Sequence, residues 1–352
     1  MATKKEEKQF EKEEKAARKA RKKRMKEEGI EKYLTPDQIR YNRNKAIIGA
    51  VWPVFRFLIL FGLCFVILYP LIFMISTAFR PNEQMNDPSV VWLPKSLTWD
   101  NIEQTAKVMK VSYWDWNNIL GNTVVNTIVM NVIASVLQVI TCSITGYGFA
   151  RFKFKFKGLL FAIVVLMIIV PPQIITIPLF MQFRNFGING IWTTSLIDTA
   201  WTMYLPALFA NGLRAGLFIF IFRQFFRGLP KELEDAAYLD GCGPLKTFLV
   251  VMVPNAKTSF LTVFLFSIVW YWNDFYVSSS FFTHSDTIAL SLKNLNAQLI
   301  QDLFGGQSVS VRQIIVWLEA GCIISITPLL IMYIFLQRYF IEGIERSGIT
   351  GM

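Results

Sequence analysis

The chain has 352 residues, of which 53% are hydrophobic, and it carries a formal net charge of +11. This combination is unusual for a soluble protein and ordinary for a membrane protein with a charged end. The charge is uneven, because residues 1–50 hold 16 of the 36 Lys and Arg and 9 of the 25 Asp and Glu. The basic excess lies beside apolar segments, so the expected partner is a lipid bilayer with anionic headgroups, and nucleic acid is not expected.

The sequence lacks the residue patterns of metal and catalytic sites. Its four cysteines are widely separated, without the paired spacing of a metal site, and the single histidine, His284, is expected to be a plain loop residue. The nearest approach to a phosphate-binding loop is GCGPLKT at 241–247, where Leu245 replaces the glycine that precedes the lysine. We therefore expect no catalytic residue, no metal site and no cofactor bound by this chain.

Six segments are long and apolar enough to cross a membrane, which takes about 20 mainly apolar residues. The fourth segment is too long for one straight crossing and is interrupted by NGLRAG at 211–216, which predicts a tilted or broken helix. Pro171 and Pro172 remove two backbone donors from the third segment and predict a bend. The predicted spans are 57–77, 122–149, 158–181, 196–222, 259–277 and 314–336.

The basic residues of the connecting segments indicate the orientation of these spans. With the N-terminus inside, the inner segments hold 28 Lys and Arg and the outer segments hold 7, which is the asymmetry between cytoplasmic and extracellular loops. The predicted fold class is therefore all-α, a multi-pass protein of the cell membrane with both termini in the cytoplasm. The predicted parts are a charged cytoplasmic tail, the first span with an extracellular loop, a five-helix core with an inner loop at 227–256, and a second cytoplasmic tail, at 1–47, 48–121, 122–337 and 338–352.

The long inner loop predicts a short helix that is too short to cross the membrane. Pro230 suits a first helical turn, acidic residues complement the positive end of the helix dipole, and Gly241 can end the helix in a left-handed conformation. A helix that lies on lipid headgroups usually has bulky apolar residues and basic flanks, and this helix has two alanines and four acids. One face of the helix carries small side chains at helical spacing and therefore suits close contact with a protein partner. This face is formed by Leu233, Ala236, Ala237 and Asp240.

This loop resembles the EAA loop of the membrane subunits of ATP-binding-cassette (ABC) importers. The EAA pattern is filled by Asp235, Ala236, Ala237, Gly241, Val251, Val253 and Pro254, with Asp in place of the usual Glu at the first position. Other stretches, among them VPPQIITIPLF, WNDF and LQRYFIEGIERSGITGM, resemble the carbohydrate importers of the maltose type, and within these the shorter of the two permease subunits. The resemblance covers about residues 70–352, although the tail has IERSG where small residues are usual.

The resemblance implies a type I ABC importer permease fold and a division of labour among several chains. Two ATPase subunits, which carry the ATP and Mg, would grip the short helix of this chain and that of a second, homologous permease. An extracellular solute-binding protein would release a sugar or oligosaccharide into the path between the permeases. The residues that would couple this chain to the ATPases are Glu232, Glu234, Asp235, Ala236, Ala237, Asp240, Gly241 and Pro254.

Two further groups of residues are candidates for the substrate path. A small and polar stripe along the second span is either a seam between helices, the common use of such residues, or a lining of the path, and both readings stay open. Near the outer end of the fifth span lie residue types that bind sugars by ring stacking and by hydrogen bonds to hydroxyl groups. The candidates are Asn131, Gln138, Trp272, Asn273 and Asp274.

Two other functions remain as alternatives. An ion-coupled secondary transporter of a small polar solute would need no soluble partner and would make the EAA spacing a coincidence. A membrane enzyme, such as a glycosyl or lipid transferase, would need catalytic acids or a metal motif at an interface, which the sequence lacks. A stable complex with an ATPase would favour the importer over both.

Overall fold

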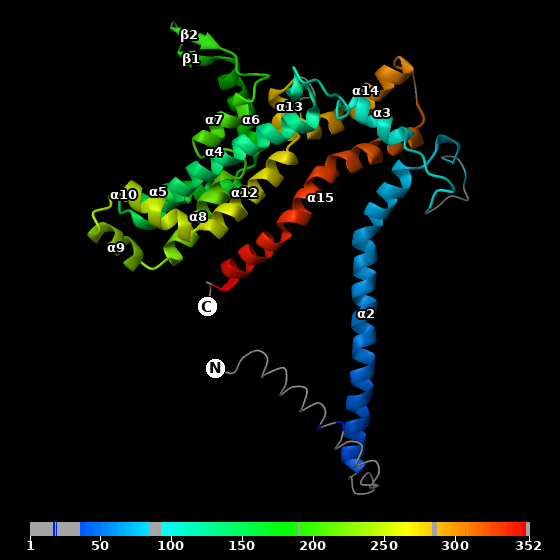
Figure 1. The fold of residues 1–352 in the computed structure, drawn as a ribbon, viewed down its shortest axis with the longest axis horizontal. Helices are drawn as coiled ribbons and strands as arrows, with labels where there is room; N and C mark the ends of the chain where they lie inside the picture. The colour runs from blue at the N-terminus through cyan, green and yellow to red at the C-terminus, as the bar shows by residue number, and fades with distance from the viewer. Residues whose placement is uncertain are drawn as a thin grey trace. The chain divides into compact units, whose positions relative to one another are not determined.

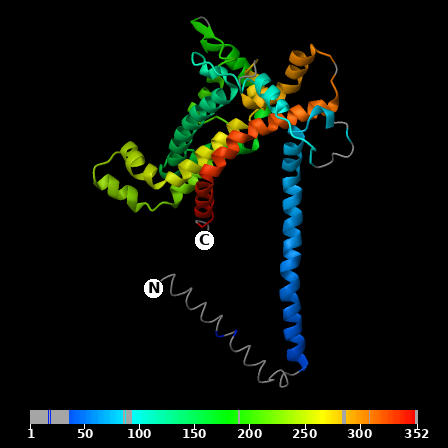
Figure 2. The same cartoon turned by 45° about the vertical axis from the view of Figure 1, so that its right-hand side comes forward.

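The computed structural model describes residues 17, 19, 36–84, 87, 93–188, 191–283, 287–307 and 309–349 (Figures 1 and 2). Most of the charged tail predicted at 1–47 lies outside these residues, and so does His284. The chain divides into two compact units, residues 1–71 and 72–352, which we describe separately.

From residue 36 onward the first unit is one long helix, α2 (Pro36–Ala78), whose last turns belong to the second unit. Its stretch Val51–Ala78 is long and apolar enough to cross a membrane and includes the span predicted at 57–77. Large apolar side chains such as Leu60, Phe61 and Val66 are exposed along it. In a bilayer such a surface can face lipid, because all the backbone bonds of a helix are satisfied within it.

The second unit is built around α4 (Thr123–Arg151), which packs along α8 (Ala215–Gly228) and also contacts α12 (Lys257–Trp272) and α7 (Trp201–Leu208). Gly146 permits the close approach of α4 to α8, since a Cβ there would lie 2.6 Å from the Cβ of Phe222. The contact buries the aromatic side chains of Phe218, Phe222 and Phe226.

The bend predicted in the third span is confirmed. Helices α5 (Lys157–Ile169) and α6 (Pro172–Arg184) are bent by 101° relative to each other, with Pro171 between them and Pro172 in the first turn of α6. The fourth predicted span is broken into α7 and α8, and Arg214 just before α8 has a left-handed backbone, with φ of 59°. Both breaks occur where the sequence contains residues that interrupt a regular helix.

By length and composition, three described helices can cross a membrane, at Val51–Ala78, Thr123–Arg151 and Val311–Gln337, or up to five if each bent pair is one span. The last of the three lies within α15 (Val311–Ile349). The second bent pair joins α12 to a preceding segment at 81°, made of α10 (Pro244–Thr247), the π-helix η4 (Phe248–Met252) and α11 (Val253–Asn255). These five candidates are consistent with the predicted count of six spans, because the one predicted span not among them, 196–222, is occupied by α7 and α8.

Several short elements between the long helices were not predicted. An antiparallel hairpin of β1 (Phe186–Ile188) and β2 (Trp192–Thr194), with Phe186 opposite Thr194, is an exception to the all-α prediction. The others are helical: η2 (Asn82–Gln84), α3 (Asp100–Val108), η3 (Ile119–Gly121), α13 (Tyr276–Phe281) and α14 (Ile288–Phe304). Helix α3 packs against α15 and α14.

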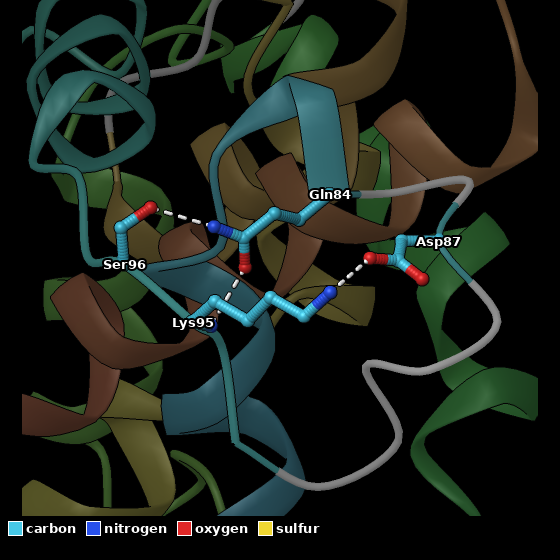
Figure 3. Close-up of polar contacts among 4 residues, drawn as sticks. All are labelled: Gln84, Asp87, Lys95 and Ser96. Atoms are coloured by element: carbon cyan, nitrogen blue, oxygen red, sulfur yellow. Dashed lines mark hydrogen bonds and ion pairs between the residues drawn. The ribbon is translucent and has the colours of Figure 1, made fainter.

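Side-chain contacts hold the segment between α2 and α3 (Figure 3). The amide of Gln84 donates to the hydroxyl of Ser96 at 2.6 Å and accepts the backbone N–H of Lys95 at 2.8 Å. The ammonium group of Lys95 lies 2.6 Å from a carboxylate oxygen of Asp87. These contacts join the two ends of the segment across about ten intervening residues.

Candidate functional site

The short helix predicted in the inner loop is α9 (Glu232–Leu239), which lies next to α8 and α10 at one end of the bundle (Figures 1 and 2). It has eight residues, too few to cross a membrane, as predicted, and it begins two residues after Pro230. The chain turns away at Gly241, whose φ of 79° is in the left-handed region, as predicted. A residue with a side chain is strained in that conformation.

Glu234 joins α9 to the end of α4. Its carboxylate accepts a hydrogen bond of 2.7 Å from the hydroxyl of Tyr147, and its second oxygen lies 3.0 Å from Nε of Arg151. Tyr147 and Arg151 are four residues apart and therefore lie on one face of the last turns of α4. Arg151 also donates to the carbonyl of Leu229, just before α9, at 2.6 Å. The side chains of Glu234 and Arg151 are only 5% and 13% exposed, so this ion pair is largely shielded from solvent.

Glu234 is buried and contacts its own chain, so its predicted role in coupling, which stays a prediction, would be exercised through α4. Its carboxylate is occupied within the chain, and Ala237, which lies close to it along the helix, is also buried. The remaining acids of the predicted set, Glu232, Asp235 and Asp240, are exposed. None of these three forms an ion pair with another described residue.

The exposed side of α9 combines charge with apolar surface. Ala236 is exposed beside Asp235, and Leu239 is 89% exposed. Leu245 at the start of α10 adds a second exposed apolar side chain. We call Glu232, Asp235, Ala236, Leu239, Asp240 and Leu245 the outward face of the loop.

The other end of the loop is anchored in the core. Phe248 and Met252 of the π-helix are buried among the aromatic residues of α8. Pro254, the last residue of the EAA pattern, is exposed in α11, just before the 81° bend into α12. The loop is therefore held at both ends, by Glu234 and by the π-helix, with its outward face between them.

The polar stripe of the second predicted span lies in a seam inside the protein. Gln138 is fully buried, donates to the carbonyl of Leu213 at 2.5 Å and accepts from the hydroxyl of Tyr271 at 2.6 Å. The hydroxyl of Thr127 accepts the backbone N–H of Ile288 at 2.9 Å. These bonds tie α4 to the segment before α8, to α12 and to the start of α14.

Asn131 differs from Gln138 and Thr127 in its hydrogen bonding. It is 1% exposed, and both polar atoms of its side-chain amide lack a hydrogen-bond partner among the described residues. A buried amide without partners is costly, so Asn131, like the buried hydroxyl of Ser135 on the same helix, has hydrogen-bonding capacity that no described residue uses.

The three candidates at the end of α12 have different surroundings. Trp272 is 5% exposed and its indole N–H donates to the carbonyl of Ser325 at 3.1 Å, so its ring belongs to the contact with α15. Asp274 accepts the backbone N–H groups of Val277 at 3.1 Å and Ser278 at 2.9 Å, which caps α13. Asn273 is exposed.

Two cavities meet at Arg214 and Asp274, near these candidates. One has a volume of about 410 Å³ and reaches between α5, α6 and α7, and the other has a volume of about 420 Å³ and is lined by both Asn273 and Asp274. The guanidinium carbon of Arg214 lies 4.3 Å from the ring centroid of Trp270. Arg214 and Tyr271 were not among the predicted site residues. Arg214 could have been identified from the sequence, because it is a charged residue within the predicted span 196–222.

Residues 140–346, more than half of the chain, match the family described as binding-protein-dependent transport system inner membrane component. The chain belongs to this family. It is therefore a multi-pass membrane protein and a transport subunit, and the family is not one of enzymes. Within the described part of the chain, no group of three or more His, Cys, Asp or Glu could hold a metal ion.

Curated relatives support this assignment. The arabinooligosaccharides transport system permease protein AraQ of Halalkalibacterium halodurans is 28% identical over 306 residues, which cover 85% of this chain and 98% of that protein. The melibiose/raffinose/stachyose import permease protein MelC of Bacillus subtilis is 27% identical over 66% of this chain and 77% of its own length. The trehalose transport system permease protein SugB of Mycobacterium tuberculosis is 25% identical over 81% of this chain and 93% of its own length.

A solved structure shares the fold. It is the crystal structure of a bacterial ABC transporter involved in the import of the acidic polysaccharide alginate, with a TM-score of 0.63 and 23% identity over 86% of this chain and 98% of that chain. The likeness confirms the predicted fold class, the ABC importer permease fold.

Proposed function

We propose that this chain is the permease subunit of an importer of a sugar or oligosaccharide, and that ATPase subunits drive it through the outward face of the α9 loop. The sugar class is supported by relatives named for arabinooligosaccharides, for melibiose, raffinose and stachyose, and for trehalose. The observation that carries the coupling is the ion pair of Glu234 with Arg151, because it fixes α9 to α4 and leaves Asp235 and Ala236 exposed.

In this proposal the work is divided among several chains. A second, homologous permease completes the path, two ATPase subunits hold ATP and Mg²⁺, and an extracellular solute-binding protein delivers the substrate. The chain lies in the bacterial cell membrane with α9 and both termini in the cytoplasm, as the distribution of Lys and Arg favours.

The contacts of α9 provide a route for force into the membrane helices. A displacement of α9 would be transmitted by Glu234 to the last turns of α4 through two short contacts, to Tyr147 and to Arg151. Helix α4 packs along α8 with Gly146 in close contact, so the two helices would move together. Packed interiors transmit such displacements because they have few voids.

We further propose that the substrate passes near Arg214 and Asp274, where the two cavities meet. Asn273 borders one of them and is exposed. Its amide nitrogen donates to the carbonyl of Val269 at 2.9 Å, which leaves its side-chain oxygen to accept from sugar hydroxyls. Asn131 and Gln138 would reach substrate only after the seam around α4 opens, and Trp272 only after its contact with α15 opens. Their predicted role in the path therefore depends on a conformational change.

The coupling is tested by co-purification with the ATPase encoded with this permease and by ATP-driven uptake of oligosaccharide into vesicles. We expect Asp235→Lys, and Gly241→Val because of its left-handed backbone, to reduce both. Asp302→Lys, a charge reversal at an exposed position of α14, serves as the matched control and should leave both unchanged. Uptake by the purified chain alone under an ion gradient, without an ATPase, would establish the secondary-transporter alternative instead.

A further inference from the structure

Five cations near the cytoplasmic end of α5 and α8 have no acidic partner among the described residues. We call Lys153, Lys155, Lys157, Arg223 and Arg227 the basic cluster. Arg223 of α8 lies over Phe161 of α5, and Arg227 and Lys157 each lie one helical turn from these two residues on the packed helices, so the last three are neighbours. None of the five forms an ion pair within the part of the chain that the structure describes, whereas the neighbouring Arg151 is paired with Glu234.

Arg223 is the most confined member of the basic cluster. Its guanidinium carbon lies 3.8 Å from the ring centroid of Phe161, and its Nε is buried without a hydrogen-bond acceptor among the residues that the structure describes. A cation that has lost part of its water and has no acceptor is unfavourable unless an anion compensates it. The terminal nitrogens of Arg223, next to Lys157 and Arg227, could contact such an anion.

The surroundings of the basic cluster are apolar. Phe152, Phe154 and Phe156 alternate with the lysines of the α4–α5 turn and are 40%, 41% and 74% exposed. Helix α5 continues this surface with the exposed side chains of Leu159 and Ile163. Aromatic and basic residues side by side at the start of an apolar helix are typical of the membrane interface. A soluble anion would neutralise the cations but would leave this apolar surface uncovered.

We propose that the basic cluster binds the phosphate headgroup of an anionic phospholipid, whose acyl chains lie along the exposed side of α5. The five cations compensate the phosphate together, Lys157 and Arg223 from the partly buried side and Lys153, Lys155 and Arg227 from the exposed side. The rings of Phe154 and Phe156 pack against the glycerol region and the chains. The inference rests on the proposed function only in placing this end of the bundle at the cytoplasmic membrane surface.

Lipid binding is measured by native mass spectrometry of the purified full chain in detergent, titrated with phosphatidylglycerol and, separately, with phosphatidylcholine. The test variant is Lys153→Gln/Lys155→Gln/Arg227→Gln, which changes only exposed side chains and so should fold normally. We expect its affinity for phosphatidylglycerol to fall by about tenfold or more, since each cation near an anionic lipid surface adds to binding. Phosphatidylcholine should bind weakly to the wild-type chain and to the variant alike.

Two control variants separate a site from a general charge effect. Lys231→Gln/Lys246→Gln/Lys257→Gln removes the same charge from three exposed lysines at the same end of the bundle, outside the basic cluster, and should retain the wild-type affinity. Lys153→Arg/Lys155→Arg/Arg227→Lys keeps the charge and should also retain it.

The proposal would be overturned if Lys231→Gln/Lys246→Gln/Lys257→Gln lowered the affinity for phosphatidylglycerol as much as the test variant does. It would also be overturned if the affinity of the test variant were unchanged. Displacement of phosphatidylglycerol by inorganic phosphate at equal concentration would also overturn it, because it would identify a site for free phosphate. Co-purification with the ATPase is scored on the same variants. If the test variant lost the ATPase while keeping its affinity for phosphatidylglycerol, the basic cluster would be a protein-docking surface. If the wild-type chain bound no ATPase but the lipid affinities behaved as expected, only the proposed function would fail.

Discussion

Arg151, the last residue of α4, and Glu234 of α9 form an ion pair in which Nε and Oε2 are 3.0 Å apart. The two residues are far apart in the sequence, yet both side chains are largely buried, and Tyr147 shares the same carboxylate. This pair connects the short loop helix α9 to α4, the central helix of the second unit. Loss of the pair should release α9 from α4 and leave α4 itself folded.

Glu234→Gln is expected to weaken the attachment of α9 to α4. The change leaves the Arg151 guanidinium shielded and unpaired, which costs about 3 kcal/mol for a buried pair. Hydrogen exchange of the backbone amides of residues 229–241 should become faster, while that of α4 stays slow. Glu232→Gln, at an exposed position in the same helix, is the control and should leave the exchange unchanged. An unchanged exchange pattern in Glu234→Gln would show that the pair does not hold α9.

Gly146→Ala is expected to destabilise the core by forcing α4 and α8 apart. The added Cβ would lie 2.6 Å from the Cβ of Phe222 and 3.0 Å from the backbone nitrogen of Arg223, and such overpacking typically costs about 1–3 kcal/mol. Gly148→Ala is a matched control in the same helix, because nothing lies within 4 Å of its Cβ position. Thermal unfolding in detergent should show a lower Tm for Gly146→Ala and no decrease for Gly148→Ala. Equal Tm values for the two variants would contradict the packing.

Tyr271→Phe should destabilise the seam between α4 and α12. It removes the donor to the buried side-chain oxygen of Gln138, and an unsatisfied buried acceptor costs about 1–3 kcal/mol. Tyr276→Phe, at an exposed position of α13, controls for loss of a hydroxyl group. The midpoint of thermal unfolding should fall for Tyr271→Phe only, and a fall of the same size in both variants would rule out this explanation.

Two substitutions at Asp274 separate its capping role from a role in which its charge contacts substrate. The N–H of Val277 donates to Oδ1 and the N–H of Ser278 donates to Oδ2. Asn has one acceptor oxygen and should keep one of these capping bonds, whereas Asp274→Ala loses both at a cost of about 1 kcal/mol. If capping is the role, oligosaccharide uptake should persist in Asp274→Asn and fall in Asp274→Ala. Loss of uptake in both variants would instead assign the function to the negative charge.

Much of this architecture follows from the sequence because it depends on local properties. The long apolar segments predict membrane helices, and the consecutive prolines at Pro171 and Pro172 predict the 101° bend because they cannot donate backbone hydrogen bonds. The left-handed turn at Gly241 was predictable for the same kind of reason, since glycine has no Cβ. The hairpin β1–β2 was missed because its three-residue strands carry too short a pattern.

The roles of individual polar residues could not be read in the same way. Glu232, Glu234 and Asp235 look equivalent in the sequence, and Trp270 and Trp272 look equally suited to bind a sugar. Only the tertiary structure distinguishes them, because burial depends on which residues of distant segments lie opposite. It places Tyr147 and Arg151 against Glu234 and Ser325 against Trp272, and leaves Asp235 and Trp270 accessible. The sequence by itself thus determined the class of protein and its loop helix, through composition and local spacing. The folded chain decided which acid holds that helix and which acids stay exposed.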